Sequence, residues 1–451
     1  MDALNPDYQC DLGGGYRLRW ATPNDGDQYA QLAAKAFYLK NEQMENPNVV
    51  GYARDLVSNN HPLCRADDVA VVVDAHNQIV AAAALLSQPL EYDGIPLKVG
   101  RPELVCSDSQ VRQRGFVRAI FELLHAKSAA RGDVMQAITG IPHYYHQFGY
   151  TWSVDYNAYI KIRIDTLPAL SSETNQIQLR RVKPAEYQQF VALYNNDRLG
   201  RNLLLTTPYT PEYFTHVLTT SVSTEGFIPL FIVNEIGSVL GYVLADQRSW
   251  DGKWAILGIG ATANQSLAQL IIPVLHAAKE LIPTIHKVVL THPDVHTVEI
   301  QVDGNHPIQQ LLINRAISYQ YDAPYTWYIR TPDMTKFLRH ITPALERRIA
   351  QSVFKGYSGK LILSFYRDGV ELDWQDGQLR AMTPWYPPVY EKDGSSANAS
   401  YPPSIFNQQL FGWRSLAELR DWRPDVWADR ESTPLLDILF PKQPSWFLWM
   451  N

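Results

Sequence analysis

Along the first third of the chain, the spacing of apolar residues changes from that of a strand to that of a helix and back. The stretch Leu97–Cys106 predicts a strand, apolar residues at helical spacing over Phe116–Ala126 predict a helix, and Val134–Ile138 predicts another short strand. A last strand, Tyr156–Ile164, is expected to complete this unit. Strand, helix and strand in succession indicate a mixed α/β sheet.

The same pattern recurs further along the chain. The strand Tyr16–Arg19 is matched by Ile177–Arg180 at an offset of 161 residues, and a hairpin over Val71–Ala81 is matched by one over Phe231–Gly241 at an offset of 160 residues. This period is far too long for a solenoid unit and therefore predicts a duplicated domain. The second copy is expected to contain strands Trp254–Ile259 and Val288–Thr291, a helix Leu267–Leu281 between them, and a last strand near Tyr325–Arg330.

The remainder of the chain differs in composition, because seven of the twelve tryptophans lie beyond Pro332. Its predicted elements are a helix capped by Asp333, a hairpin over Leu361–Trp374, and helices over Ile405–Leu419 and Pro434–Phe440. The expected architecture is therefore α/β followed by α+β. We expect domains at residues 1–165, 166–331 and 332–451.

Composition narrows the class of protein. With 46% hydrophobic and 19% charged residues, the chain has enough apolar mass to exclude global disorder, and its net charge of −6 argues against a nucleic-acid binder. No apolar run reaches the roughly 18 residues of a membrane span, and Met1–Asn5 shows no secretory signal. Cys10, Cys64 and Cys106 are too scattered for a disulfide framework. A soluble, cytoplasmic protein is expected.

One stretch, Glu103–Arg118, has the pattern of an anion site. A strand ends, a short loop follows, and a helix starts near Gly115. The amino end of a helix exposes unpaired N–H groups and a partial positive charge, and Arg112 and Arg114 can complement a phosphate. Basic residues also precede helices on many solvated loops, so the spacing alone leaves both interpretations open.

A second stretch, Tyr144–Tyr150, follows the strand Val134–Ile138. A tyrosine at this place can donate its phenolic proton to a leaving group. The alternative is an aromatic packing cluster, which is the commoner role of such residues.

Together these stretches resemble known motifs. Arg112–Val117 resembles the acetyl-CoA signature of GNAT-type N-acetyltransferases, although Val117 stands where that signature prefers Gly or Ala. Tyr145-x-x-Phe148-Gly149-Tyr150 is similar to the element after the fifth strand of the same superfamily. The whole chain resembles the enhanced-intracellular-survival (Eis) type, which has an active GNAT domain, a degenerate GNAT domain and a sterol-carrier-like (SCP2-like) C-terminal domain.

The resemblance implies acetyl-CoA as the co-substrate and assigns roles to residues. Tyr145 would protonate the CoA thiolate, and the α-carboxylate of Asn451 would accept the amine proton, with the apolar tail Trp446–Met450 drying the site. That tail could equally pack against its own domain. Backbone amides after Val105 would polarise the thioester carbonyl. The implied acetyl-CoA contacts are Val105, Cys106, Ser107, Arg112, Gln113, Arg114, Gly115, Phe116 and Val117.

The acceptor is less determined. In GNAT folds the first helical region lines the acceptor pocket, which here implies Asp27, Phe37 and Glu42. The acidic residues could attract a cationic amine or could form a solvated helix face. The expected acceptor is a primary amine of a polyamine, an aminoglycoside-like compound or a lysine side chain. Eis-type relatives form hexamers, so a homo-oligomer is expected.

The remaining candidate residues give weaker evidence of a functional site. The second copy has a glycine-containing loop, Leu257–Gln265, but no arginine there, and is interpreted as a structural copy without an acetyl-CoA site. His286, His292 and His296 lack metal-ligand spacing, so no metal is expected. Cys106 is interpreted as a small buried residue. The rival functions are an apolar-ligand carrier built on the Trp-rich third domain and a CoA-binding protein without turnover.

Overall fold

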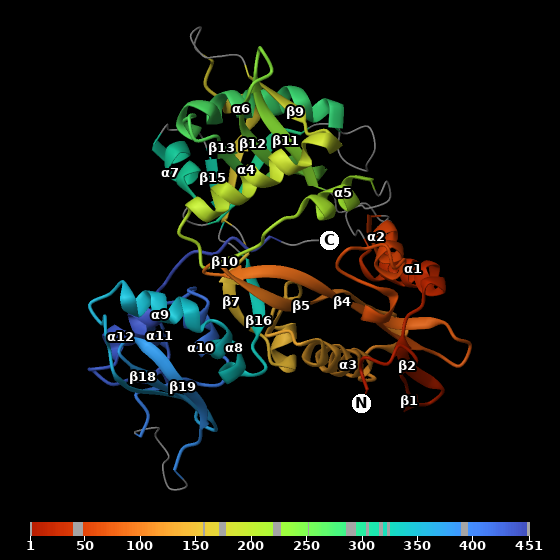
Figure 1. Ribbon diagram of the computed structural model, residues 1–451. Helices are drawn as coiled ribbons and strands as arrows, with labels where there is room; N and C mark the ends of the chain where they lie inside the picture. Colours follow the sequence, from red (N-terminus) through yellow and green to blue (C-terminus); the bar gives the residue numbers. More distant parts are fainter. Residues whose placement is uncertain are drawn as a thin grey trace.

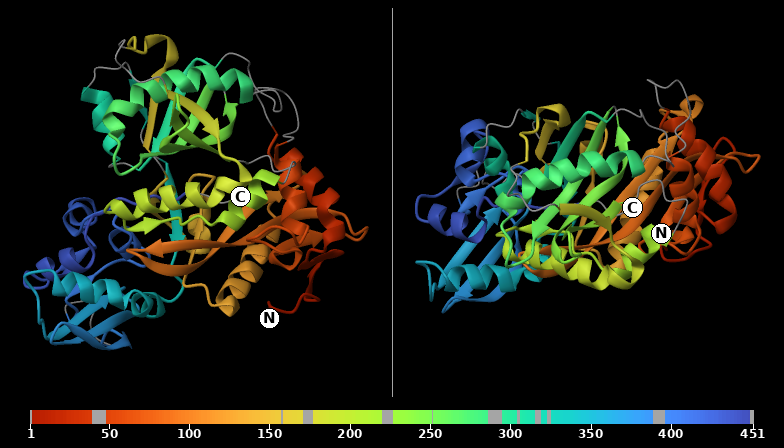
Figure 2. Two further views of the ribbon diagram at one scale, coloured as in Figure 1. Left: turned by 45° about the horizontal axis from the view of Figure 1, so that its top comes forward. Right: turned by 90° about the horizontal axis from the view of Figure 1, so that it is seen from above.

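The computed structural model describes residues 2–38, 48–156, 158–170, 177–219, 227–250, 252–285, 295–303, 306–314, 319–322, 325–388 and 396–448. Figure 1 shows three units: the second (green) lies across the first (red to orange) and the third (blue). Figure 2 shows the same arrangement from two further sides. None of the described helices combines the length and the apolar composition that a membrane span needs.

The first unit is a mixed sheet with helices on both faces. Its strands lie in the order β1-β2-β3-β4-β5-β6-β16-β7, and β10 pairs with β4. Side chains alternate along β3: Val69 and Val71 face α1 and α2, whereas Ala70 and Val72 face α3, which is why this strand is apolar throughout. The strands are β1 Gln9–Gly13, β2 Tyr16–Trp20, β3 Val69–Val73, β4 Ile79–Tyr92, β5 Ile95–Ser107, β6 Met135–Ile138, β7 Thr151–Asp155, β10 Leu205–Thr206 and β16 Thr326–Arg330, and the helices are α1 Gly26–Ala36, α2 Asn48–Val57 and α3 Phe116–Arg131.

The second unit repeats this order of elements. Its strands lie in the order β15-β8-β14-β13-β12-β11-β9. A contact recurs at the offset seen in the sequence: Arg19 forms an ion pair with Asp25, and Arg180 forms one with Glu186, each at 2.8 Å. The elements are β8 Ala158–Arg163, β9 Ile177–Arg181, α4 Tyr187–Gly200, α5 Pro211–Thr219, β11 Phe227–Asn234, β12 Val239–Trp250, β13 Lys253–Ala261, α6 Leu267–Ile285, β14 Thr297–Val302, α7 Pro307–Asn314 and β15 Tyr319–Asp322.

The two units exchange their last strands. β8, which the sequence places at the end of the first unit, pairs with β14 and β15 of the second sheet. Conversely β16, from the end of the second copy, lies between β6 and β7 of the first sheet. The expectation that Tyr156–Ile164 completes the first unit is therefore wrong. An apolar pattern specifies that a strand forms and which face is buried, but does not specify its partner.

The third unit packs a five-stranded sheet, in the order β19-β18-β17-β20-β21, against short helices. Asp333 caps its first helix, as predicted, by accepting the N–H of Lys336 at 2.8 Å. The single helix expected over Ile405–Leu419 is two helices, because Gly412 takes a φ of +70° and Ser415 begins a new helix with a capping box. The elements are α8 Met334–His340, α9 Thr342–Ala350, β17 Gly359–Ser364, β18 Gly369–Gln375, β19 Gln378–Trp385, β20 Ala399–Ser400, α10 Phe406–Leu410, α11 Leu416–Trp422, β21 Trp427–Ala428 and α12 Thr433–Leu439.

The last described residues leave the third unit and lie between the other two. Trp446 donates its backbone N–H to Leu205 of β10 at 2.8 Å. The carbonyl of Leu448 accepts hydrogen bonds from the side chains of Gln88 at 2.8 Å and Thr207 at 2.9 Å. Trp446, Phe447 and Leu448 are fully buried. This tail therefore connects all three units.

Candidate functional site

The parallel strands β5 and β6 separate after a short contact. They pair at two positions, Val99 with Met135 and Gly100 with Gln136. Beyond Gly100, β5 continues along β4 to Ser107, while β6 ends at Ile138. Between these two described strands, the β6-facing edge of β5 is therefore released from sheet pairing, and we call this the β5/β6 opening.

A β-bulge lies on β5 at this opening. The register of β5 against β4 shifts between Glu103 and Cys106, so that Leu104 and Val105 lie opposite a single residue of β4. Leu104 has a φ of +49°, a left-handed conformation that is uncommon for a leucine. A bulge turns backbone groups away from the regular ladder, which makes them available to a ligand.

The amino end of α3 lies directly after β5. Gly115 is the N-cap with a φ of +82°, and its carbonyl accepts the first intrahelical bond from Ala119 at 3.0 Å. The backbone N–H groups of the first turn have no partner within the helix. Arg112 and Arg114 are exposed beside them, and Arg114 stacks 5.4 Å from the ring centroid of Tyr16. The local sequence thus forms an exposed, positively charged helix end.

Tyr145 follows β6, the other strand that borders the opening. It belongs to the 3-10 helix Tyr144–Phe148 and is 5% exposed, packed on Phe121 of α3 and Tyr328 of β16. Burial raises the pKa of its phenol, and the charge of Glu103 adds to the shift. The phenol therefore stays protonated near neutral pH and is available as a hydrogen-bond donor.

Glu103 is a site residue that the sequence analysis missed. Its carboxylate lies 2.8 Å from the guanidinium of Arg101, which is almost fully buried, whereas the Glu103 side chain is 24% exposed. The charge of Glu103 contributes to the raised pKa of the Tyr145 phenol. Its charge within a predicted strand was the available signal, but Lys98 and Arg101 of the same strand are charged as well, so the sequence did not single it out.

Comparison with known families identifies the first unit. Residues 17–153 match the family model described as acetyltransferase (GNAT) domain. This match covers most of the first unit, which we therefore call the GNAT domain. The match contains the opening, the bulge, the amino end of α3 and Tyr145. No curated protein matches the sequence.

Solved structures resemble nearly the whole chain. A GCN5-related N-acetyltransferase from Kribbella flavida is 16% identical, with a TM-score of 0.62 over 95% of this chain and 97% of that one. One from Anabaena variabilis is 12% identical, with a TM-score of 0.65 over 95% and 98%. Eis1 from Mycobacterium abscessus is 12% identical, with a TM-score of 0.58 over 96% and 100%. At these identities the likeness concerns the fold.

The GNAT domain brings together some of the residues singled out in the sequence. Val105 and Val117 both pack against the cluster that holds Tyr145, whereas Phe116 belongs to another cluster and packs on Tyr16. Ser107 is the last residue of β5. The Cys106 side chain instead faces the α1 side of the sheet, and burial raises the pKa of its thiol to about 12, which keeps it protonated and unreactive.

The acceptor residues are less closely grouped. Asp27 forms an ion pair with Arg54 at 2.8 Å, and both side chains are more than half exposed, which is typical of a solvated helix face. Phe37 ends α1 and is 39% exposed. Four residues considered in the sequence lie outside the described residues, namely Glu42, His286, His292 and Asn451. The predicted strand Val288–Thr291 lies outside them as well.

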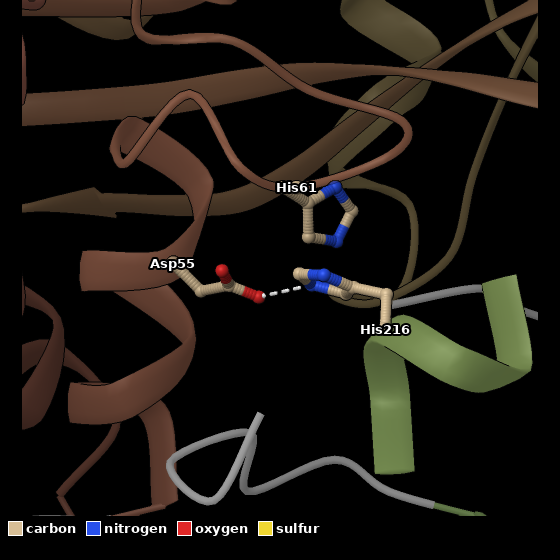
Figure 3. Close-up of side chains that lie close together, drawn as sticks. All are labelled: Asp55, His61 and His216. Carbon is tan, nitrogen blue, oxygen red and sulfur yellow. Dashed lines mark hydrogen bonds and ion pairs between the residues drawn. The ribbon is translucent and has the colours of Figure 1, made fainter. Parts of the chain in front are cut away.

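A polar cluster links the GNAT domain to the second unit. Asp55 of α2, His61 of the following loop and His216 of α5 bring their polar atoms within 4.8 Å of one another (Figure 3). His216 Nε2 lies 2.9 Å from Asp55 Oδ2. His61 Nδ1 accepts the N–H of Leu63 at 3.1 Å, so the neutral ring carries its proton on Nε2, the nitrogen that faces His216 in Figure 3. That nitrogen is then a donor without a lone pair for a metal, and the arrangement fits a hydrogen-bonded link between α2 and α5.

Proposed function

We propose that the GNAT domain transfers an acetyl group from acetyl-CoA to a primary amine. One observation carries this proposal: the two strands that border the β5/β6 opening are followed by a positively charged helix end, after β5, and by a buried, protonated tyrosine, after β6. The first feature suits a diphosphate, and the second suits a thiolate leaving group. Together they account for the two ends of the donor, the diphosphate and the thioester sulfur.

The donor would be held by backbone as much as by side chains. The first-turn amides of α3 and the guanidinium groups of Arg112 and Arg114 would bind the diphosphate of CoA. Gly115 leaves the approach open, since a Cβ placed there would meet nothing within 4 Å. The pantetheine would lie along the released edge of β5, which places the thioester at the bulge.

The reaction then requires two proton movements. The amine nitrogen forms a bond to the thioester carbon, the carbon–sulfur bond breaks, and the sulfur takes a proton from Tyr145. The attacking nitrogen releases a proton, which returns through solvent to the phenol. An ammonium acceptor must first lose one proton, and we assign that proton to Glu103, whose partly exposed carboxylate lies on β5 next to the bulge. The role that the resemblance gives to Asn451 stays a prediction.

The second unit is proposed to be a structural copy without a CoA site. The turn before α6 has no arginine to match Arg112 or Arg114. In addition, the indole of Trp446 packs on Gly258 of β13, where an added Cβ would approach the ring to 2.9 Å. This surface is therefore filled by the chain itself. The sterol-carrier-like identity of the third unit likewise stays a proposal from the resemblance.

Calorimetric titration with acetyl-CoA tests the donor site. We expect the double variant Arg112→Ala/Arg114→Ala to raise the dissociation constant of acetyl-CoA about tenfold or more, because two charge-assisted contacts to phosphate are lost. The matched control is Arg367→Ala/Arg380→Ala, which removes the same charge from two exposed residues of the third unit. Equal binding by both double variants would contradict the site.

Turnover is tested separately by thiol release. Wild-type protein with acetyl-CoA is offered polyamines, amino sugars and a lysine peptide, and the free thiol of CoA is measured. Release that depends on one of these amines supports the acetyltransferase. Tight binding of acetyl-CoA with no release above hydrolysis would instead show a CoA-binding protein without turnover.

A further inference from the structure

We propose that Tyr29 is a positioning residue that aims the backbone N–H of Val105 at the thioester oxygen. This inference rests on the proposed function and deepens it, because it names the part of the fold that sets the oxyanion donor. Tyr29 lies in α1, 75 residues before the bulge, and no motif in the sequence connects the two.

The first step is the contact itself. The hydroxyl of Tyr29 donates a hydrogen bond to the backbone carbonyl of Leu104 at 3.1 Å, and the tyrosine is fully buried. Burial raises the pKa of Tyr29 far above its usual value, so the hydroxyl keeps its proton and remains a donor. This contact holds the carbonyl of the bulge on the α1 side of the sheet.

The second step follows from the geometry of the peptide group. The carbonyl of Leu104 and the N–H of Val105 belong to the same trans peptide, in which C=O and N–H point in opposite directions. A carbonyl held toward α1 therefore turns the N–H of Val105 toward the other side of the sheet. The Val105 side chain packs there against the cluster that contains Tyr145. The N–H is thus directed to the side on which the proposed leaving-group acid lies.

The third step concerns strain. Leu104 has a φ of +49°, and a non-glycine residue in this region is held there by its surroundings at a cost. Without the hydrogen bond from Tyr29, the Leu104 carbonyl would be a buried acceptor lacking that partner, and the peptide would be freer to rotate. An oxyanion donor is effective when it is oriented before the reaction begins. Tyr29 supplies that orientation from outside the opening.

The test compares two tyrosines that make the same kind of contact. Tyr29→Phe removes the hydroxyl and keeps the ring. The matched control is Tyr92→Phe, because Tyr92 is also fully buried and donates to a backbone carbonyl, that of Leu410 at 2.8 Å, in the contact with the third unit. We expect Tyr29→Phe to lower kcat about 10- to 100-fold with little change in the dissociation constant of acetyl-CoA. Tyr92→Phe is expected to retain wild-type kcat.

A spectroscopic readout separates positioning from general destabilisation. Infrared difference spectra of carbonyl-labelled acetyl-CoA bound to the protein report the hydrogen bond to the thioester oxygen. We expect a lowered carbonyl frequency in the wild type and in Tyr92→Phe, and a frequency nearer to that of free acetyl-CoA in Tyr29→Phe. A carbonyl frequency in Tyr29→Phe equal to that of the wild type, together with full kcat, would overturn the inference, and so would loss of acetyl-CoA binding together with activity. If wild-type protein shows no amine-dependent turnover, the proposed function fails first, independently of Tyr29.

Discussion

The indole of Trp446 lies directly on Gly258, so close that an added Cβ would come 2.9 Å from the ring. In the register of the two hairpins, Leu244 faces Gly258 as Ala84 faces Glu103. A glycine covered by tryptophan in the second unit thus stands where the GNAT domain has a partly exposed carboxylate. The guanidinium of Arg201 stacks over the indole at 4.2 Å. The tail therefore covers, in the second unit, the position that corresponds to the partly exposed Glu103 of the GNAT domain.

Removing this side chain is expected to destabilise the protein. Trp446→Ala should lower the free energy of unfolding by about 3–5 kcal/mol, because a fully buried indole leaves a cavity between the units. Urea denaturation measures the change. Trp422→Ala is the control, since Trp422 is 53% exposed and its loss should cost less than about 1 kcal/mol. Equal losses in the two variants would contradict the packing role of the tail.

Tyr145→Phe tests the proposed acid. We expect kcat to fall about 10²- to 10⁴-fold, because the thiolate then leaves without a proton donor, while acetyl-CoA binding changes little. Tyr144→Phe changes the neighbouring residue of the same 3-10 helix and serves as the control. Steady-state kinetics of thiol release measures both.

The raised pKa of Tyr145 predicts the shape of the pH profile. Because burial shifts the pKa upward, the phenol stays protonated through neutral and mildly alkaline pH. The wild-type rate should therefore show no decline from ionisation of Tyr145 between about pH 7 and pH 10. A decline in this range that disappears in Tyr145→Phe would contradict a buried, protonated acid.

Glu103→Gln tests the carboxylate at the bulge. Glutamine keeps the size of the side chain but cannot accept a proton, so kcat/KM for the amine should fall about 10²-fold while acetyl-CoA binding is retained. Glu91→Gln is a close control: Glu91 lies on β4, is 19% exposed and pairs with the buried Arg198, as Glu103 is 24% exposed and pairs with the buried Arg101. If both variants lose the same activity, Glu103 acts through structure alone.

Local signals predicted the parts of the site that depend on local structure. A glycine and two arginines before an apolar helix indicated the amino end of α3, and the structure begins that helix at Phe116. Tyr145 lies in one aromatic cluster with Phe121 of this helix, which is the packing alternative that the sequence left open, while its role as an acid stays a prediction. The helix end is fixed by neighbours within a few residues, whereas the packing of Tyr145 also depends on Tyr328 of the distant strand β16.

Features that depend on distant partners were not predictable in the same way. β8 is apolar whichever sheet it joins, so its pattern does not reveal that it crosses to the second sheet. The bond between Tyr29 and Leu104 joins residues 75 positions apart. In the sequence Glu103 is indistinguishable from any polar position of a strand. Only the bulge beside it identifies it as a site residue. Strand partners and contacts between distant residues therefore had to come from the three-dimensional structure.

Acid sensitivity provides a test in a different part of the molecule. His306 is buried, and burial together with the charge of Arg201 lowers its pKa to about 3. The folded protein therefore keeps this histidine neutral, whereas the unfolded chain binds a proton below about pH 6.5. Stability from this group is complete above pH 6.5 and is lost as the pH falls toward 3, with a loss of about 2 kcal/mol already at pH 5.

His306→Asn isolates that contribution. The amide oxygen of asparagine can replace Nδ1, which accepts the N–H of Ile308 at 3.2 Å, but it does not titrate. We expect the decrease in unfolding free energy between pH 7 and pH 5 to be about 2 kcal/mol smaller in the variant than in the wild type. His340→Asn, at an exposed histidine of α8, should leave the decrease unchanged. Identical pH dependence in the wild type and His306→Asn would show that His306 is not held neutral by the fold.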